Sequence, residues 1–309
     1  LLVSSFFILM QAQAGIVEPI YKQLKDPTTG GQPSTVSMSI TPDGKKMFVL
    51  SHTRNKYYIY DLTTPFDLST MDVSNRSEVD FVGDDPPSAS QIKDIEFNND
   101  GTKVFVFGRD GTLHIHNLTT PYDVASISSS TAVPDDGLDY TTAYGTVSRI
   151  HGVTFNNDGT KMYLSDGTIT STDITQVNLS TPFDPSSGTS TSNLNTESIT
   201  ARYTMDLAFD DDGTRLYLSE SNVGVAINYM YVWKLSNPFE LSSATYVDKW
   251  QILGNGNNLS PYAWTFGNNG MKLYIGTEDA STDGDNIIYE YDLSCPYGIV
   301  LCESETASV

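Results

Sequence analysis

Two aspartates, Asp94 and Asp206, stand at the same offset before the glycine of a repeated phrase, which reads "FNNDGTKVF" in one place and "FDDDGTRLY" in another. Paired carboxyl groups at a set separation can act as acid and base in the cleavage of a glycosidic bond. Because the two aspartates lie in nonadjacent units of the repeat, they could face each other across a central channel. The competing interpretation is that these acids bind water or anchor loops.

The position just before these acids differs from unit to unit. When the units are aligned on their turns, this position holds Val36, Lys93, His151, Met205 and Tyr262, and the next one holds Ser37, Asp94, Gly152, Asp206 and Ala263. Packing alone would favour the same residue in every unit, so polar variation here indicates a site. The sequence therefore predicts a ligand-binding site that contains Lys93, Asp94, His151, Asp206 and Tyr262.

An acidic loop is the candidate for metal binding. The segment "GTEDASTDGDN" (276–286) carries the four acids Glu278, Asp279, Asp283 and Asp285. Hard oxygen ligands at this density can bind Ca²⁺, although the spacing is not that of an EF-hand. His114 and His116 share a strand face, where packed or solvated imidazoles compete with metal ligation. No other cofactor is expected.

The elements that must position these residues follow a regular repeat. The turn phrase occurs five times, with its glycine at Gly44, Gly101, Gly159, Gly213 and Gly270. Each unit predicts a strand, an Asx-Gly turn, a second strand, a variable loop, a third strand ending in a phrase such as "YDLTTPFD", and a weaker fourth strand. One four-stranded sheet cannot cover both of its apolar faces, whereas five sheets packed around an axis can. The sequence therefore predicts an all-β, five-bladed β-propeller over residues 15–300.

Closure of the ring has its own candidate segment. The fifth unit ends after its third strand, and the strand-like segment 16–24 has no unit of its own. We expect this segment to supply the outer strand of the last blade, where Pro19 is tolerable because that strand is an edge. If it paired with another molecule instead, the same edge would be an assembly contact. Recurrent aromatic residues, Phe97 and Phe66 among them, are expected to fill the interfaces between blades.

The turn phrases resemble a known class of repeats. "TPDGKKMFV" and "NNDGTKMYL" are similar to the Pro-Asp-Gly and YVTN-type repeats of TolB-like periplasmic proteins, lactonase-like propellers and bacterial surface proteins. The resemblance implies the fold and carries no catalytic residue, and those families usually have shorter repeats and more blades. In ring size and residue type, Asp94, Glu96 and Asp206 also resemble the carboxylates of five-bladed glycoside hydrolases.

Composition and the chain ends favour a location outside the cytoplasm. Residues 1–14 form an apolar run that ends in Ala12-Gln13-Ala14, which is typical of a cleaved signal peptide. The alternative is a retained apolar segment that mediates assembly. Cys295 and Cys302 predict a local disulfide that holds the start of the C-terminal tail, residues 301–309. The chain has 38 acidic and 17 basic residues, so nucleic acid is an improbable partner. The apolar run is too short for an ordinary membrane-spanning helix, and no other segment is predicted to cross a membrane.

Three functions remain open at this point. The leading interpretation is an exported, non-catalytic binding or scaffold module with a protein or glycan partner at the cell surface, because the usual nucleotide and hydrolase motifs are missing from the sequence. The second is a structural subunit of an extracellular filament or homo-oligomer that assembles through its N-terminal segment. The third is a carbohydrate-active enzyme that uses the channel carboxylates.

Overall fold

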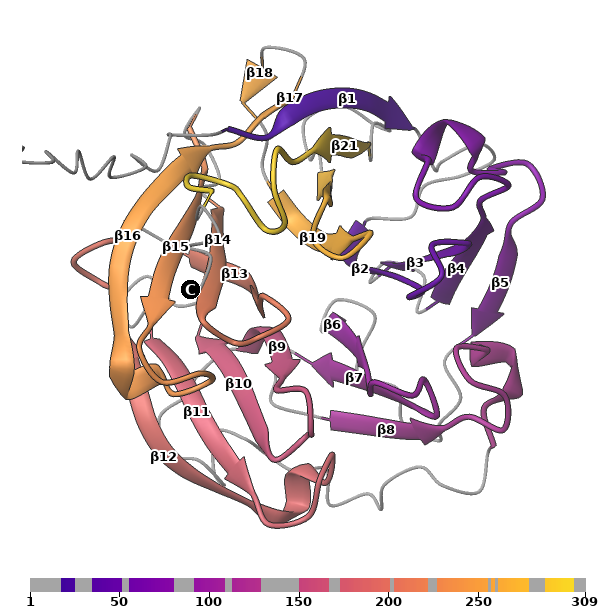
Figure 1. Cartoon of the computed structure of the whole chain (residues 1–309). Helices are drawn as coiled ribbons and strands as arrows, with labels where there is room; N and C mark the ends of the chain where they lie inside the picture. Colours follow the sequence, from indigo (N-terminus) through magenta and orange to yellow (C-terminus); the bar gives the residue numbers. More distant parts are fainter. Residues whose placement is uncertain are drawn as a thin grey trace, which may run out of the picture.

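The computed structural model describes most of the chain as strands grouped in small antiparallel sheets. It describes residues 18–25, 35–51, 56–80, 92–108, 113–128, 150–166, 173–200, 203–221, 227–254, 257–258, 261–277 and 287–302. The sheets are arranged around a common axis (Figure 1). The prediction of an all-β, five-bladed propeller is confirmed.

Each blade begins with the strand nearest the axis and proceeds outward. Blade 1 comprises β2 (Thr35–Ile40), β3 (Lys46–Ser51), β4 (Lys56–Asp61) and β5 (Ser77–Asp80). The described part of blade 2 comprises β6 (Ile92–Phe97), β7 (Lys103–Gly108) and β8 (Leu113–Asn117). Blade 3 comprises β9 (Ile150–Phe155), β10 (Lys161–Asp166), β11 (Asp173–Leu179) and β12 (Gly188–Asn195).

Blades 4 and 5 follow the same order. Blade 4 comprises β13 (Tyr203–Phe209), β14 (Arg215–Ser221), β15 (Tyr229–Leu235) and β16 (Ala244–Gln251). Blade 5 comprises β19 (Pro261–Gly267), β20 (Lys272–Thr277), β21 (Ile288–Asp292) and, on the outside, β1 (Ile20–Lys25). A small hairpin, β17 (Leu253–Gly254) and β18 (Asn257–Asn258), joins the last two blades. Short 3₁₀ helices follow third strands: η1 (Leu68–Thr70), η2 (Val124–Ser126), η4 (Pro185–Ser187) and η5 (Leu241–Ser243).

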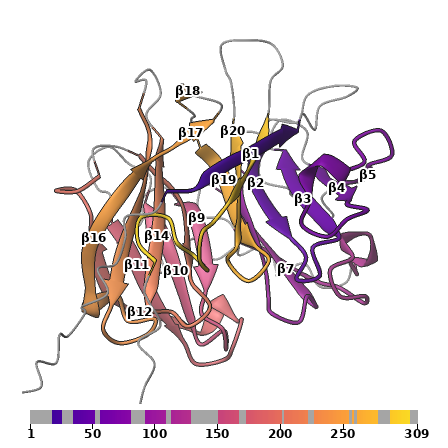
Figure 2. The same ribbon diagram turned by 45° about the horizontal axis from the view of Figure 1, so that its top comes forward.

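The ring closes as predicted. The antiparallel pairing of β1 with β21 places Tyr21 opposite Tyr291 and Leu24 opposite Tyr289, and Figure 2 shows β1 running along the outside of blade 5. The strand begins at Ile20, so Pro19 precedes it and costs no ladder hydrogen bond. The inner strands β2, β6, β9, β13 and β19 contact one another in a complete circuit, with β19 packed against β2. The segment that could have paired with another molecule therefore pairs with β21 of its own chain.

A glycine and an aromatic residue lock each turn. The five turn glycines have left-handed φ values between 68° and 75°, and five aromatic residues in the second signature have φ values between 54° and 61°. Each aromatic N–H donates to the glycine carbonyl of its own blade, and the aromatic ring lies over the glycine so closely that a Cβ at Gly159 would be 2.3 Å from the Phe183 ring. We call these pairs the glycine–aromatic clasps: Gly44–Phe66, Gly101–Tyr122, Gly159–Phe183, Gly213–Phe239 and Gly270–Tyr297. Only glycine fits this position, because it needs both a positive φ and no side chain.

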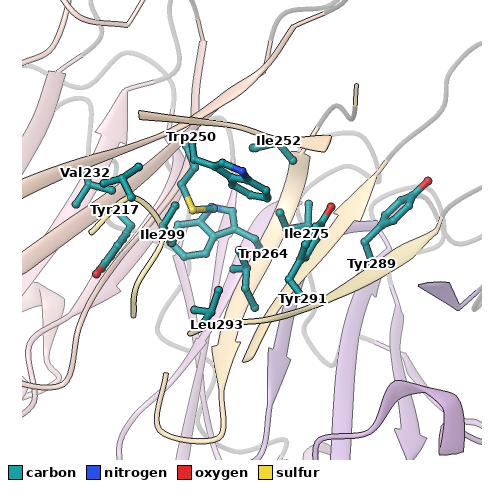
Figure 3. Close-up of a cluster of buried hydrophobic side chains, with 13 residues drawn as sticks. Tyr217, Val232, Trp250, Ile252, Trp264, Ile275, Tyr289, Tyr291, Leu293 and Ile299 are labelled. Atoms are coloured by element: carbon teal, nitrogen blue, oxygen red, sulfur yellow. The ribbon is translucent and has the colours of Figure 1, made fainter. Parts of the chain in front are cut away.

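The core lies between neighbouring blades. Figure 3 shows one such cluster, in which Tyr217 of β14 and Trp250 of β16 pack near Trp264 and Tyr291 of blade 5. The aromatic residues that the repeat predicts at interfaces are found there; the Phe155 ring, for example, lies 4.7 Å from the Phe105 ring of the preceding blade. Burying one such ring stabilises the fold by roughly 1.5–3 kcal/mol.

The predicted disulfide is present, since Cys295 and Cys302 are bonded to each other. In the part of the chain that the structure describes, no helix is long and apolar enough to cross a bilayer. Residues 1–14 and the tail from 303 onward lie outside the described residues.

Candidate functional site

Every inner strand has a register irregularity at the same place. The pairing shifts between Thr35 and Ser37 in β2 and between Ile92 and Asp94 in β6, with corresponding shifts in β9, β13 and β19. The bulged position falls on Lys93, His151 and Tyr262, which are three of the predicted site residues, and on Val36 and Met205 in the other two blades. Bulges re-aim side chains and occur often beside functional sites. The inner-strand position whose residue type differs among the blades is therefore also a position that is not paired with the neighbouring strand.

Asp94 joins three blades. Its side chain is 4% exposed, and its Oδ1 accepts hydrogen bonds from the Ser37 hydroxyl of blade 1 (2.6 Å) and from the N–H of Ile95 (2.8 Å). Its Oδ2 accepts the N–H of Val153 in blade 3 at 2.7 Å. Both carboxylate oxygens therefore bond to groups that are fixed in the ring.

Asp206 repeats this arrangement two blades further on. Its Oδ1 accepts the N–H of Leu207 at 2.8 Å, and its Oδ2 accepts the N–H of Trp264 in blade 5 at 3.4 Å. The Ser37 hydroxyl serves the same purpose in blade 1, because it accepts the N–H of Ile95 at 3.2 Å. Inner strands have no further strand on their axial side, so side chains at this position satisfy the backbone N–H groups of the next blade.

Glu96 differs from the two aspartates in its surroundings. It is half-buried, and its carboxylate accepts a hydrogen bond from the Thr154 hydroxyl at 3.2 Å. Glu96, Asp94 and Asp206 line one cavity of about 200 Å³ at the axis, whose wall also includes Trp264. The equivalents of Glu96 in the other blades are small residues: Ser39, Thr154, Ala208 and Thr265. These small side chains leave space in the cavity beside the Glu96 carboxyl group.

Burial changes the ionisation of all three acids. Burial raises the pKa of Asp94 to about 7, against the opposing effect of its hydrogen bonds. Burial, and then the charge of Asp94, raise the pKa of Glu96 to about 8. Burial, and then the charges of Asp94 and Glu96, also raise the pKa of Asp206 well above its usual value. All three carboxyl groups therefore keep their protons to a higher pH than exposed carboxyl groups do.

This arrangement can exchange protons and can accept hydrogen bonds from a small polar or cationic group. A metal ion needs convergent ligands, and within the described ranges no three His, Cys, Asp or Glu side chains are grouped to hold one. The predicted calcium ligands Glu278, Asp279, Asp283 and Asp285 lie outside the described residues. His114 and His116 stack with ring centroids 6.4 Å apart, and burial, then the charge of His114, lowers the pKa of His116 to about 4.

The structure divides the predicted site residues into two that line the axial cavity and three that are not part of its lining. Asp94 and Asp206 line the axial cavity together. Lys93, His151 and Tyr262 are half-buried at the bulges of their strands, and the His151 ring lies 6.4 Å from that of Tyr203. The hydrogen bonds that each acid accepts from an N–H group of the next blade were not predicted from the sequence. The sequence does carry a hint of these bonds, because Ser37, Asp94 and Asp206 stand at the same distance before their turn glycines.

Fold and site together define a five-bladed β-propeller with an acid-lined axial cavity. No family model matches the chain, and no curated protein matches it. Solved structures resemble it distantly. Hydrazine synthase of Kuenenia stuttgartiensis is 13% identical with a TM-score of 0.45, and the match covers 81% of this chain and 57% of that one.

Two further solved structures show a similar degree of likeness. A protein of Bacteroides fragilis described as a candidate 6-phosphogluconolactonase is 14% identical with a TM-score of 0.44, over 90% of this chain and 70% of that one. A protein of Desulfotomaculum acetoxidans described as functionally unknown is 12% identical with a TM-score of 0.47, over 88% of this chain and 90% of that one. At this distance no activity transfers from these proteins, and the fold assignment rests on the strands themselves.

Proposed function

We propose that the protein is a non-catalytic binding or scaffold module that acts outside the cytoplasm and recognises a protein or glycan at the mouth of its axial channel. The observation that carries this proposal is the bonding of Asp94 and Asp206. Each aspartate uses both carboxylate oxygens to accept N–H groups of its own and the next blade. Acids held in this way position strands, and a general acid or base must instead reach the substrate.

The mouth of the channel supplies the recognition groups in this proposal. Lys93, His151 and Tyr262 combine a cation, an imidazole and a phenol at equivalent bulged positions of three blades. A rigid ring with variable groups at one level suits binding, because little conformational entropy is lost when the ligand docks. The disulfide and the apolar run ending at Ala14 support export.

Glycan and protein arrays on the purified chain beginning at Gly15 test this function. We expect at least one ligand to bind and to be recovered chemically unchanged. We also expect Lys93→Ala and Tyr262→Ala to weaken binding without lowering the unfolding midpoint. If neither substitution alters the affinity, the channel mouth is not the binding site.

A carbohydrate-active enzyme is the second candidate, and Glu96 is the observation that favours it. Its carboxyl group has a pKa raised to about 8 and shares a cavity with two other acids, which is the condition for a general acid at neutral pH. A broad glycan hydrolysis screen with Glu96→Gln as the matched variant decides between the candidates. Turnover that Glu96→Gln abolishes without unfolding the chain would replace the binding proposal with this one.

A further inference from the structure

The basic residue two positions after each turn glycine is paired with a residue of the third strand in its own blade. In four blades that residue is an acid or an amide, and the pairs are Lys46 with Asp61, Lys103 with Asn117, Lys161 with Asn178 and Lys272 with Asp292. Both acids bond to their lysine at 2.6 Å. In blade 4 the same register places Arg215 opposite Lys234. Like charges directly opposite each other in a sheet are destabilising.

A second acidic position lies in the next blade, directly after the clasp aromatic. In blades 1 to 4 the residues at this position are Asp67, Asp123, Asp184 and Glu240. Glu240, for example, bonds to Lys161 of the preceding blade. In blade 5 the residue is Gly298, and a Cβ there would lie 2.3 Å from the Sγ of Cys295. The disulfide therefore leaves no space for an acid, and these three equivalent positions between blades 4 and 5 carry two positive charges and no negative one.

Arg215, which is half-buried, and Lys234, which is exposed, line a small cavity at this interface. Its volume is about 40 Å³, and its apolar wall includes Val232 of blade 4 and, from the disulfide loop, Ile299 and Leu301. Small-molecule sites have roughly 300–1,000 Å³, so this cavity is too small for a sugar or a nucleotide. One water needs about 10–15 Å³, so a space of this size fits a carboxylate group.

The sequence continues from the wall of this cavity into an acidic segment. Leu301 lines the cavity, and the bond of Cys302 to Cys295 fixes the next residue. The chain then reads Glu303-Ser304-Glu305, which lies outside the described residues. Consecutive Cα atoms are about 3.8 Å apart, so the Cα of Glu303 is no more than about 7.6 Å from that of Leu301. Covalent connection alone therefore keeps an acidic residue close to the two cations.

We propose that this cavity between blades 4 and 5 is the docking site of the chain's own acidic segment, residues 303–305. A carboxylate of this segment enters the cavity, accepts hydrogen bonds from the Arg215 guanidinium and neutralises Lys234. Arginine binds a carboxylate through two parallel N–H···O bonds. The acid that the disulfide excludes at position 298 is thereby supplied by residues that follow the disulfide. Arg215 and Lys234 do not line the axial cavity, so this inference is independent of the function proposed above.

An NMR titration of the glutamate carboxyl groups in the full chain tests the contact directly. We expect Glu303 or Glu305 to have a pKa below the ordinary value of about 4.3, because an adjacent cation stabilises the carboxylate. The net charge of −21 acts in the opposite direction, so the overall field of the protein cannot produce this result. Arg215→Gln and Lys234→Gln should each raise that pKa. Lys234 is exposed, so its variant should fold even if the Arg215 variant does not.

A double-mutant cycle measures the same contact through stability. In urea denaturation Glu303→Gln/Glu305→Gln should lower the folding equilibrium constant of wild type by about twofold to fivefold, as the loss of an exposed ion pair does. The same change should not lower the folding equilibrium constant of Lys234→Gln. High salt should remove the difference, because it screens exposed charges.

Lys249→Gln is the matched control for the loss of one positive charge from blade 4. The Lys249 Nζ lies 3.8 Å from the centroid of the Tyr229 ring, so its removal should leave the pKa of both glutamates unchanged. The proposal is overturned if neither glutamate has a lowered pKa, if Lys249→Gln changes that pKa as much as Lys234→Gln does, or if the free-energy changes in the cycle are additive.

Discussion

Replacing Gly159 with alanine tests whether the clasps hold the blades in shape. Gly159 has a φ of 69°, and a Cβ there would lie 2.3 Å from carbons of the Phe183 ring. The left-handed backbone costs an alanine about 1–2 kcal/mol, and forcing the ring aside adds roughly 1–3 kcal/mol of overpacking. We therefore expect Gly159→Ala to lower the free energy of unfolding by about 2–5 kcal/mol.

Urea denaturation with linear extrapolation measures this change, with Gly188→Ala as the matched control. Gly188 has a φ of −81°, which alanine adopts without strain, so its substitution should leave stability unchanged or raise it by about 0.4–1 kcal/mol. The double variant Gly159→Ala/Phe183→Ala separates the two contributions, because removal of the ring relieves the collision and leaves the φ penalty. The free-energy changes of the two single variants should therefore not add.

Two results would refute this reasoning. If Gly159→Ala is as stable as Gly188→Ala, the turn tolerates a side chain and the clasp does not constrain it. If the changes at Gly159 and Phe183 add within the error of the measurement, the two residues do not interact, and the repeated contact contributes nothing.

Two other predictions concern buried polar groups. Burial lowers the pKa of His116 to about 4 from its ordinary 6.5, so between these values the unfolded chain binds a proton that the folded chain excludes. The contribution of His116 to stability should therefore fall by about 3 kcal/mol as pH drops from 7 to 4. The buried acids act in the opposite direction, so the measurement is the difference between wild type and His116→Gln in denaturant titrations at both pH values, and an equal pH dependence of the two chains contradicts this assignment. Tyr163→Phe leaves the Phe239 carbonyl without its hydroxyl donor and should cost about 1–3 kcal/mol by urea denaturation. No loss would mean that water satisfies the carbonyl.

The fold was predictable because every repeat carries the same turn and the same aromatic residues that pack one blade against the next. A regular spacing of turn glycines implies equivalent sheets, and a last unit without its fourth strand implies that another segment supplies it. The pairing of β1 with β21 confirms this prediction. The equivalent sheets and the completion of the last sheet both follow from the packing of blades, and this packing requires similar residues at a regular spacing in the sequence.

The site was less predictable, because its geometry depends on contacts between blades. The bulges at Lys93 and His151 follow from strand register, which the residues of one strand do not reveal. Phenylalanine rarely adopts positive φ, so the conformation of Phe66 could not be inferred from its residue type. The partners of Asp94 are backbone groups of other blades, and a backbone N–H has no signature in the sequence.

The union of β1 with β21 also affects the order in which the molecule is completed. Gln23 bonds to Glu290 across 267 residues of sequence, so the final sheet can form only after every intervening blade has been synthesised. Until then β1 has no partner strand and presents an open edge of the kind that recruits foreign strands. A chain stalled late in translation would therefore expose β1, and its pairing with β21 covers that edge once the last blade is complete.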